Sequence, residues 1–351
     1  MKYRILPGTD LSLSEVGFGL WTLATNWWGE KTDDEAIALL HQARDLGVTF
    51  FDTADTYANG RGETLLKMAF GENPKGVVYA TKFGYDIYNT TEQERRGQQE
   101  LPHRFDRESV RFACEQSLQR LGVEQIPLWQ IHNARLGGVF NDEIWEVLDE
   151  LKTEGKIRYA GVALGPANGW ITEGQGFLKH RPISAMQIIY NLFEQWPGQE
   201  FFPAARENEV GLLVRVPHSS GMLEGHYTPE TVFSPNDHRR HRPRTWLLNG
   251  IEKLKSLEFL TQGRNATIGQ QALKFILSEP LVCTTLPNIY DAEQLREFAA
   301  APDLPDLTPD DLARLADLTE VNFGVPEERM RVKGEALSEL EAWESERLAA
   351  R

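Results

Sequence analysis

Four residues of complementary chemistry, Asp52, Tyr57, Lys82 and His132, stand at or just after the ends of three apolar segments. An ammonium close to a tyrosine favours the phenolate and lowers the pKa of the phenol from its usual value of about 10. A neighbouring carboxylate keeps that ammonium charged and aimed, and an imidazole can hydrogen-bond a carbonyl group and fix its orientation. Together, the four groups could protonate a carbonyl oxygen while a hydride reaches the carbonyl carbon.

The segments that carry these residues are typical of buried strands. Residues 48–52, 77–82 and 126–132 are rich in β-branched, aromatic and other apolar side chains, and each run ends on one polar or charged residue. Parallel α/β barrels build their active sites from side chains at the carboxyl ends of successive strands. The pattern therefore predicts that the four groups meet at one mouth of a barrel.

Each of the four residues also has a structural interpretation. Asp52 could cap the next helix, Tyr57 could lie on the rim, Lys82 could be solvated, and His132 could be a hydrogen-bonded core histidine. Taken singly, these interpretations are the more common ones. Four complementary types on three strand ends favour the catalytic interpretation.

Helical segments alternate with the strands. Residues 32–46 have one apolar face and a capping box formed by Thr32 and Glu35, and similar patterns cover residues 63–70, 107–121 and 142–154. This alternation predicts a parallel sheet, and eight strands close it into a (β/α)8 TIM barrel. The expected strands are residues 16–21, 48–52, 77–82, 126–132, 157–163, 185–190, 211–216 and 281–286.

Other segments complete the predicted domain. An N-terminal β-hairpin, residues 2–6 and 11–13 around a turn at 7–10, is expected to close the barrel floor. Long connections at residues 85–105 and 217–250 are expected to overhang the mouth, since long loops in compact domains are usually functional. We expect one barrel over residues 1–325 and a helical extension over 326–351 that packs on the barrel or on a partner.

Composition excludes several classes of function. The 37 basic and 52 acidic residues give a net charge of −15, which argues against general nucleic-acid binding. Two cysteines, Cys114 and Cys283, are too few for a disulfide framework or a Cys-rich zinc site. We found no secretion signal and no apolar run of about 20 residues, so we expect a cytoplasmic protein with a small-molecule carbonyl substrate and no membrane partner. The oligomeric state is left open.

The residues Phe51-Asp-Thr-Ala-Asp-Thr-Tyr57, followed by Asn59-Gly-Arg-Gly-Glu63, resemble the signature of the aldo-keto reductases. Ala80-Thr-Lys-Phe-Gly84 resembles the lysine motif of that family, and Leu128-Trp-Gln-Ile-His132 resembles its histidine motif. The likeness runs in matching order to about residue 325. It implies that Tyr57 is the general acid, that Lys82 and Asp52 tune it, and that His132 orients the carbonyl.

The same resemblance implies a nicotinamide dinucleotide cofactor, NADP(H) in most members, with NAD(H) as the alternative. No Gly-x-Gly-x-x-Gly follows a strand, which is consistent with a family that lacks the Rossmann fold. Gln187 matches a glutamine that holds the carboxamide, and residues 216–225 resemble a loop that covers the pyrophosphate. The expected cofactor-binding residues are Gly19, Trp21, Asp52, Ala163, Gln187, Arg215, Pro217, His218, Ser219, Ser220, Gly221, Leu223, Asn288, Gln294 and Glu297.

The chain departs from the family pattern at three places. Ala163-Leu164 stands where many members have Ser-Asn. Arg215 replaces an aromatic residue that stacks on the nicotinamide, which adds charge beside a ring that becomes cationic on oxidation. Residues 286–290 lack the basic residue that commonly holds the 2′-phosphate, and Gln294 and Phe298 replace an Arg and an Asn, whereas Glu297 matches. The basic run 239–244 either supplies the missing charge or is a solvated loop.

Aromatic residues near these motifs could line an apolar substrate pocket. The candidates are Trp21, Trp27, Trp28 and Tyr85, which could equally be core or rim residues. Two other functions remain open from the sequence. One is a nucleotide-binding regulatory subunit with the same barrel and little turnover. The other is a metal-dependent barrel enzyme, which the lack of a His-x-His pair and of a strand-end carboxylate cluster disfavours.

Overall fold

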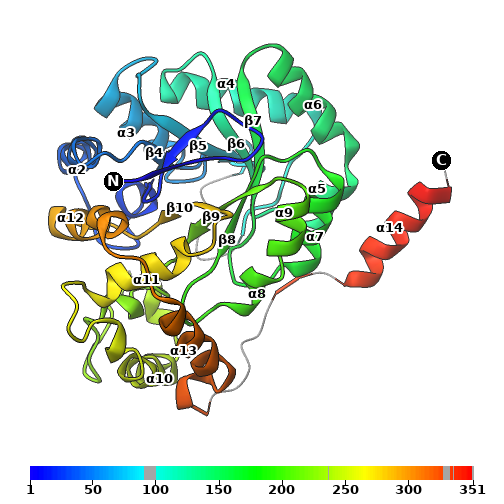
Figure 1. Ribbon diagram of the computed structural model, residues 1–351. Coiled ribbons are helices and arrows are strands. Elements are labelled where there is room, and N and C mark those ends of the chain that lie inside the picture. The colour runs from blue at the N-terminus through cyan, green and yellow to red at the C-terminus, as the bar shows by residue number, and fades with distance from the viewer. Residues whose placement is uncertain (91–99, 236, 327–332, 335, 350–351) are drawn as a thin grey trace.

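A computed structural model of the chain describes residues 1–90, 100–235, 237–326, 333–334 and 336–349. Eight parallel strands hydrogen-bond to their neighbours in chain order from β3 to β10. A parallel bridge from Val16 to Thr285, with the Gly17 amide 2.8 Å from the Thr285 carbonyl oxygen, joins the first and last of them. Figure 1 shows these strands at the centre with helices around them, so the predicted (β/α)8 barrel is confirmed. The strands are β3 (Phe18–Gly19), β4 (Phe50–Asp52), β5 (Val78–Phe83), β6 (Ile126–His132), β7 (Ile157–Ala163), β8 (Ala185–Ile189), β9 (Gly211–Arg215) and β10 (Val282–Leu286).

Several helices begin at a polar residue whose side chain caps the first turn. Thr32 precedes α2 with its side chain accepting from the Glu35 amide, and the Glu35 carboxylate accepts from the Thr32 amide at 2.8 Å, which is the predicted capping box. Asp106 caps α4 in the same manner at the Ser109 amide. The helices are α1 (Trp21–Ala24), α2 (Asp33–Asp45), α3 (Arg61–Phe70), α4 (Arg107–Leu121), α5 (Leu136–Phe140), α6 (Asp142–Thr153), α7 (Ile171–His180), α8 (Trp196–Gln199), α9 (Phe202–Glu207), α10 (Arg244–Lys255), α11 (Ile268–Leu277), α12 (Ala292–Ala300), α13 (Pro309–Glu320) and α14 (Leu337–Ala349).

The N-terminal hairpin closes one end of the barrel, as expected. Strands β1 (Tyr3–Ile5) and β2 (Ser12–Ser14) pair antiparallel. Leu6, Leu11 and Leu13 are buried in one cluster with apolar residues near the beginnings of the barrel strands, such as Phe50. The opposite end, where the strands finish, is therefore left for ligands.

The first barrel strand is shorter than predicted. Strand β3 covers only Phe18–Gly19, and the chain turns helical at Leu20, so that Trp21 begins α1 instead of ending a strand. The Leu20 amide donates to the Asp52 carbonyl oxygen at 2.9 Å, which fixes the turn above the end of β4. A Cβ atom at Gly17, just before β3, would lie 2.9 Å from the Phe50 ring of β4, so this glycine is needed for the close approach of these two segments.

Alternation along the strands separates the core from the barrel interior. Phe83 and Trp129, on β5 and β6, face the surrounding helices and stack with ring centroids 3.8 Å apart. Lys82 and Gln130 precede and follow them in sequence and therefore point inward. Truncating an aromatic residue in such a core typically costs about 3–5 kcal/mol, so the stacked pair helps hold the strand register that aims Lys82.

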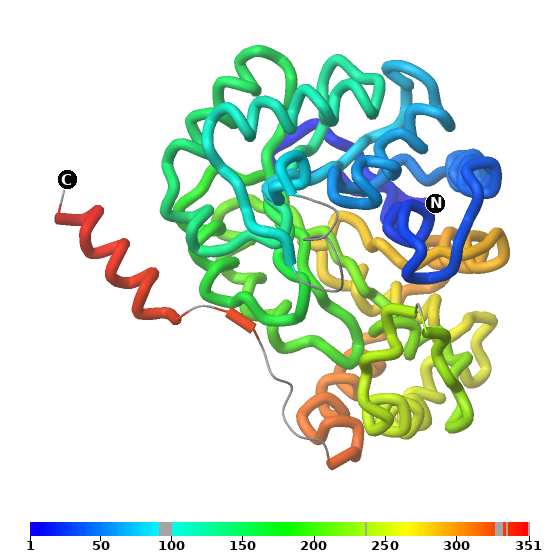
Figure 2. The backbone as a smooth tube through the Cα atoms, turned by 180° about the vertical axis from the view of Figure 1, so that it is seen from behind, coloured from blue at the N-terminus to red at the C-terminus, as the bar shows by residue number. Residues whose placement is uncertain are grey.

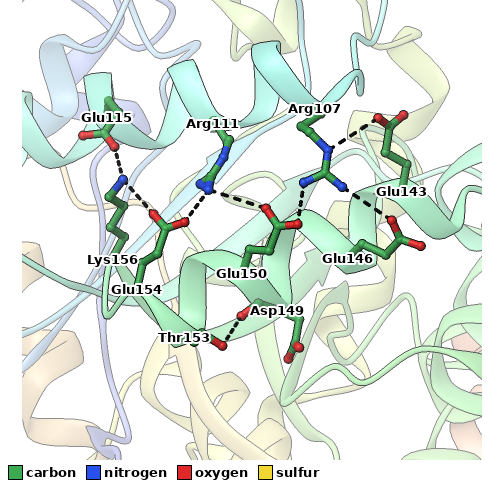
Figure 3. A network of polar contacts seen from close by, with 10 residues as sticks. All are labelled: Arg107, Arg111, Glu115, Glu143, Glu146, Asp149, Glu150, Thr153, Glu154 and Lys156. Carbon is green, nitrogen blue, oxygen red and sulfur yellow. Dashed lines mark hydrogen bonds and ion pairs between the residues drawn. The ribbon is translucent and has the colours of Figure 1, made fainter.

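Charged residues connect α4 and α6 on the outer surface (Figure 3). Arg107 lies 2.5 Å from Glu150, and Lys156 lies 2.6 Å from Glu115 and 2.8 Å from Glu154. Exposed pairs of this kind contribute little each, about 0–1 kcal/mol. The network is on the outside of the barrel and belongs to helix packing rather than to the site.

Helix α14 lies outside the ring of barrel helices in both views (Figures 1 and 2). Its Leu340 is buried beside Gly176 of α7, and the Trp343 ring lies 5.3 Å from the Phe140 ring. Arg347 forms an ion pair with Asp142 at 3.0 Å. Of the long loop 85–105, Arg95 and Arg96 fall outside the described residues. None of the helices in the described ranges is both long and apolar enough to span a bilayer.

Candidate active site

Strand register brings the predicted groups to one end of the barrel. Asp52 pairs with Ala80, two residues before Lys82, and Lys82 pairs with Gln130, two residues before His132. Residues two apart on a strand share a face, so all of these side chains except that of Tyr57 project into the barrel from the carboxyl ends of β4, β5 and β6. Tyr57 reaches the same place from the loop after β4. The left-handed residues Ala58, Asn59 and Gly60 reverse the chain there before α3 begins.

Lys82 and Asp52 form a buried ion pair. Lys82 Nζ is 2.5 Å from Asp52 Oδ1 and 2.7 Å from the Thr53 carbonyl oxygen, and the two side chains are only 1% and 5% exposed. Burial acts first and lowers the pKa of Lys82, but attraction to Asp52, and then to Tyr57, outweighs it and raises that pKa overall. The lysine is therefore held as a cation beneath the tyrosine.

Tyr57 lies between the lysine, the histidine and an indole. Its ring centroid is 5.2 Å from Lys82 Nζ and 5.7 Å from the His132 ring, which meets it edge-on. The Trp21 ring packs against its other side at 6.4 Å. The phenol is partly exposed, so a molecule entering the mouth can reach its hydroxyl.

His132 is held neutral. Burial, together with the positive charges of Lys82 and Arg215, places the pKa of the imidazole well below its ordinary value. Its Nδ1 lies 3.2 Å from Thr56 Oγ1. When the threonine hydroxyl donates to Nδ1, the ring proton sits on Nε2, where it can donate to a carbonyl oxygen.

Two amides bind the second oxygen of Asp52. Gln187 Nε2, on β8, is 2.9 Å from Asp52 Oδ2, and Gln130 Nε2, on β6, is 3.2 Å from the same atom. Hydrogen bonds to a carboxylate favour its charged form. Gln130 was not predicted, although its position two residues before His132 on the same strand face was a usable signal.

The interior next to these amides fits a carboxamide. Because Gln187 directs its nitrogen at Asp52, its Oε1 remains as an acceptor for an amide N–H, and Gln130 Oε1 is buried without a partner among the described residues. Gly19 and Ala163, at the ends of β3 and β7, add no side-chain polar group. Arg215 Nη2 instead donates to the carbonyl oxygens of Leu164 at 2.8 Å and Pro166 at 3.1 Å.

The loop after β9 has an unusual backbone. Val216, Ser219, Ser220 and Gly221 all have positive φ values, a conformation that is rare for residues other than glycine and that clusters at functional sites. Ser220 Oγ accepts a hydrogen bond from Arg242 Nη2 at 3.0 Å, and Arg242 Nε is buried and unpartnered within the described ranges. Hydroxyl and guanidinium donors that converge in this way fit phosphate oxygens.

All six residues of this loop that are expected to bind the cofactor, Pro217 to Gly221 and Leu223, are buried. The His218 side chain is only 2% exposed, packs on Phe298 with centroids 4.5 Å apart and hydrogen-bonds the Gly269 carbonyl oxygen at 3.0 Å. Burial lowers the pKa of His218 to about 4. Leu223 is also fully buried, and Pro217, which precedes His218, is buried too. Because His218 and Leu223 are buried, with His218 packed on Gly269 of α11 and Phe298 of α12, these residues can offer a ligand only their backbone.

The residues expected at the adenosine end are surrounded by carboxylates. Gln294 donates to Glu224 at 3.0 Å and accepts from the Tyr290 amide at 3.0 Å, while Glu297 accepts from Thr267 at 2.5 Å. The Asp291 carboxylate caps α12 by accepting from the Glu293 and Gln294 amides, each at 2.9 Å. Burial, the largest influence, raises the pKa of Glu224 to about 8. Asn288 is partly exposed on the loop after β10.

The basic run 239–244 is mostly engaged within its own loop. Arg239 forms an ion pair with Asp237 at 2.6 Å and lies 4.3 Å over the Trp28 ring. Arg244 donates to the Thr231 carbonyl oxygen at 2.8 Å. Arg242 belongs to this basic run and donates to Ser220, in the loop whose donors fit phosphate oxygens.

One side of the space around Tyr57 is lined by three tryptophans and a histidine. Trp21 lies 6.4 Å from Trp27 and 6.3 Å from Trp28, and His238 packs on Trp21 at 5.2 Å. The His238 amide also donates to the Trp27 carbonyl oxygen at 3.1 Å, which joins the loop after β9 to the loop after β3. His238 was not predicted, because nothing in the sequence relates it to tryptophans more than 200 positions away.

Tyr85 stands on the other side, against His132. Its ring meets the His132 ring edge-on at 5.2 Å and stacks on His103 at 4.6 Å. Asn133 donates to the Tyr85 hydroxyl at 2.5 Å, and that hydroxyl donates to Glu100. The structure therefore places Trp21 and Tyr85 on opposite sides of the Tyr57–His132 pair. Over the described part of the chain, no group of three or more His, Cys, Asp or Glu side chains could hold a metal ion.

Comparison with known proteins gives a consistent result. The sequence profile of the family described as "Aldo/keto reductase family" matches residues 15–320. An NADH-specific methylglyoxal reductase from Escherichia coli (strain K12) is 28% identical over 334 residues, covering 91% of this chain and 99% of that protein. Aldo-keto reductase yakc [NADP(+)] from Schizosaccharomyces pombe is 29% identical over 324 residues, with coverage of 90% and 91%. The holo form of the aldo-keto reductase AKR11C1 from Bacillus halodurans superimposes with a TM-score of 0.72 at 26% identity, covering 91% of this chain and 96% of that one.

Proposed function

Because the chain belongs to the aldo/keto reductase family, we propose that Asp52, Tyr57, Lys82 and His132 form its reaction centre. The protein is an NAD(P)H-dependent oxidoreductase that reduces an aldehyde or ketone to an alcohol. The observation that carries the residue assignment is the convergence on Tyr57, whose ring lies 5.2 Å from the buried Lys82 ammonium and 5.7 Å from the His132 ring.

Each of the four side chains has a separate role in the reduction of the carbonyl group. Nε2 of neutral His132 donates to the carbonyl oxygen and turns it towards the Tyr57 hydroxyl, which gives up its proton to that oxygen. The Lys82 ammonium stabilises the resulting phenolate, and Asp52, paired with it at 2.5 Å, keeps the lysine charged and aimed. When bound, the reduced nicotinamide supplies the hydride to the carbonyl carbon.

The residues present fit such a cofactor. We propose that Gln187 Oε1 holds the carboxamide and that Ser219, Ser220 and Gly221, with Arg242, hold the pyrophosphate. Gly19, Trp21, Ala163 and Asn288 would border the nucleotide, with Pro217, His218 and Leu223 contributing backbone only.

For the dinucleotide itself, the family resemblance implies NADP(H), but the charges in this chain favour NAD(H). A 2′-phosphate needs cationic or N–H donors, and here Asp291 already occupies the amides at the N-terminus of α12, while Glu297 lies on the same helix. We propose that NAD(H) binds more tightly than NADP(H). Dissociation constants measured by tryptophan fluorescence for NADH and NADPH test this, and tighter binding of NADPH would reverse it.

Turnover is favoured over the regulatory alternative because both relatives named above are reductases. The substrate we propose is a carbonyl compound that enters between the Trp21, Trp27 and Trp28 wall and Tyr85. We also propose that residues 1–325 form the catalytic barrel, that residues 326–351 are an accessory extension, and that the enzyme acts in the cytoplasm.

The direct test is the rate of NADH or NADPH oxidation with a panel of aldehydes and ketones, followed at 340 nm. Wild-type protein should turn over at least one carbonyl compound. Protein that binds nucleotide tightly but reduces none of the panel would favour the regulatory role.

A further inference from the structure

Arg215 is a cation at the reaction centre that has no carboxylate partner among the residues that the structure describes. It ends β9, two residues after Leu213, which pairs with Gln187, so its side chain points into the same mouth as Gln187. Its Nη2 donates to two carbonyl oxygens, those of Leu164 and Pro166. Across the described ranges, Arg215 makes no ion pair with an Asp or Glu, and Asp52 is already paired with Lys82.

The guanidinium acts on the reacting groups themselves. Burial is the largest influence on the pKa of Arg215 and lowers it, and the neighbouring Tyr57 and Asp52 act in the opposite direction. Arg215 in turn contributes to the low pKa of His132. Glu194 is a further electrostatic neighbour, but its carboxylate is bound by Asn191 at 2.7 Å and Ser219 at 3.2 Å. The site therefore presents a fixed positive charge towards the space in front of Tyr57.

We propose that Arg215 makes the protein discriminate between the redox forms of its nicotinamide cofactor, so that the reduced form binds more tightly than the oxidised form. This inference rests on the proposed function, because the nicotinamide must lie beside Tyr57 for a carbonyl there to be reduced. The ring is neutral when reduced and carries one positive charge when oxidised. A fixed guanidinium beside it therefore repels the oxidised form alone.

The size of the effect is measurable. A tenfold preference corresponds to ~1.4 kcal/mol. One unit charge a few ångströms away in a partly buried site supplies at least that much. The positive charge also distinguishes Arg215 from an uncharged residue that merely stacks on the ring, which would bind the two redox forms more equally.

Two other roles for Arg215 make different predictions. As a brace, it would tie the ends of β7 and β9 together through the Leu164 and Pro166 carbonyl oxygens, and its loss would weaken binding of every nucleotide alike. If Arg215 acted by stacking its planar guanidinium on the nicotinamide ring, Arg215→Lys would weaken the binding of both redox forms. If Arg215 acts through its charge, Arg215→Lys keeps the preference for the reduced form and Arg215→Met abolishes it.

The experiment is a fluorescence titration of full-length protein with NADH, NAD+, NADPH and NADP+, with Trp21, Trp27 and Trp28 as reporters near the site. Wild type, Arg215→Lys and Arg215→Met are compared after circular dichroism has verified their folding. We expect wild type to bind the reduced form at least tenfold more tightly than the oxidised form of its preferred dinucleotide. Arg215→Met should lower that ratio about tenfold, mainly by tightening the oxidised form, and Arg215→Lys should keep most of it.

Arg242→Met is the matched control, because Arg242 reaches the loop at Ser220 and should affect both redox forms equally. A wild-type ratio near one overturns the proposal whether or not the variants fold. A parallel loss of affinity for both forms in Arg215→Met also overturns it and assigns the brace role. Wild-type protein that binds none of the four nucleotides overturns the proposed function itself, which distinguishes the two failures.

Discussion

Gln187 and Asp52 lie 135 positions apart in the chain, and the amide nitrogen of the first is 2.9 Å from Oδ2 of the second. Asp52 Oδ1 is in turn 2.5 Å from the Lys82 ammonium. The residue proposed to hold the nicotinamide carboxamide is thus one hydrogen bond from the ion pair proposed to tune Tyr57. Cofactor binding and proton transfer share a continuous set of contacts, and the variants below separate their parts.

Tyr57→Phe removes the proposed proton donor and little volume. We expect carbonyl reduction to fall by about 10²–10⁴-fold, the usual contribution of a positioned general acid, with the dissociation constant for NADH nearly unchanged. Steady-state kinetics and fluorescence titration measure the two quantities. Tyr3→Phe, at an exposed tyrosine of the floor hairpin, is the control. Parental activity in Tyr57→Phe would remove this residue from the mechanism.

Lys82→Met leaves the Asp52 carboxylate buried without its cation. Breaking a buried pair in this way typically costs about 3–5 kcal/mol of unfolding free energy. We expect the double variant Asp52→Asn/Lys82→Met to recover part of that loss, because the uncompensated charge is gone. Urea denaturation of wild type, the two single variants and the double variant provides the cycle. A double variant less stable than both singles would show that burial of the charge is not the main cost.

Gln187→Leu and Gln130→Leu remove the two amides from the same oxygen of Asp52, and only Gln187 is proposed to contact the cofactor. Gln187→Leu should weaken NADH binding about tenfold or more and also lower kcat. Gln130→Leu should lower kcat and shift its pH profile with little change in NADH affinity. Equal loss of NADH affinity in both variants would contradict the assignment of the carboxamide to Gln187.

His218 gives stability a pH dependence of predictable sign. Burial lowers its pKa to about 4 in the folded protein, whereas an unfolded histidine titrates near 6.5. Between these values the unfolded state binds more protons, so this stabilisation is present above pH 6.5 and declines as the pH falls towards 4. One proton contributes a slope of up to about 1.4 kcal/mol per pH unit.

Unfolding free energies of wild type and His218→Phe, measured between pH 4 and 7, test this. The variant should show a shallower slope. His226→Gln, at an exposed position of the same long loop, is the control. An unchanged slope in His218→Phe would mean that this histidine does not titrate below its ordinary range in the folded protein.

The convergence of Asp52, Lys82 and His132 was predictable from the sequence for a simple reason. Side chains alternate along a strand, and parallel strands in a barrel end at the same rim, so local pattern and chain order alone place the three groups together. The capping box at Thr32 and Glu35 is equally local, and it located the start of α2. The position of Trp21 at the start of a helix was not predictable in this way, because the chain turns helical above the end of β4 and an apolar run does not encode that turn.

The sequence by itself therefore determined the barrel, its order of strands and the residue types at its mouth, because these follow from short-range periodicity and from hydrogen bonding between neighbours. Tertiary structure decided the rest. It packed His218 under the loop, brought His238 to the tryptophans, and turned the Gln187 amide to Asp52. It also left Arg215 without a carboxylate partner in the described part of the chain. Those outcomes depend on where long loops and distant strands come to rest, and that is set by packing and charge balance over the whole chain.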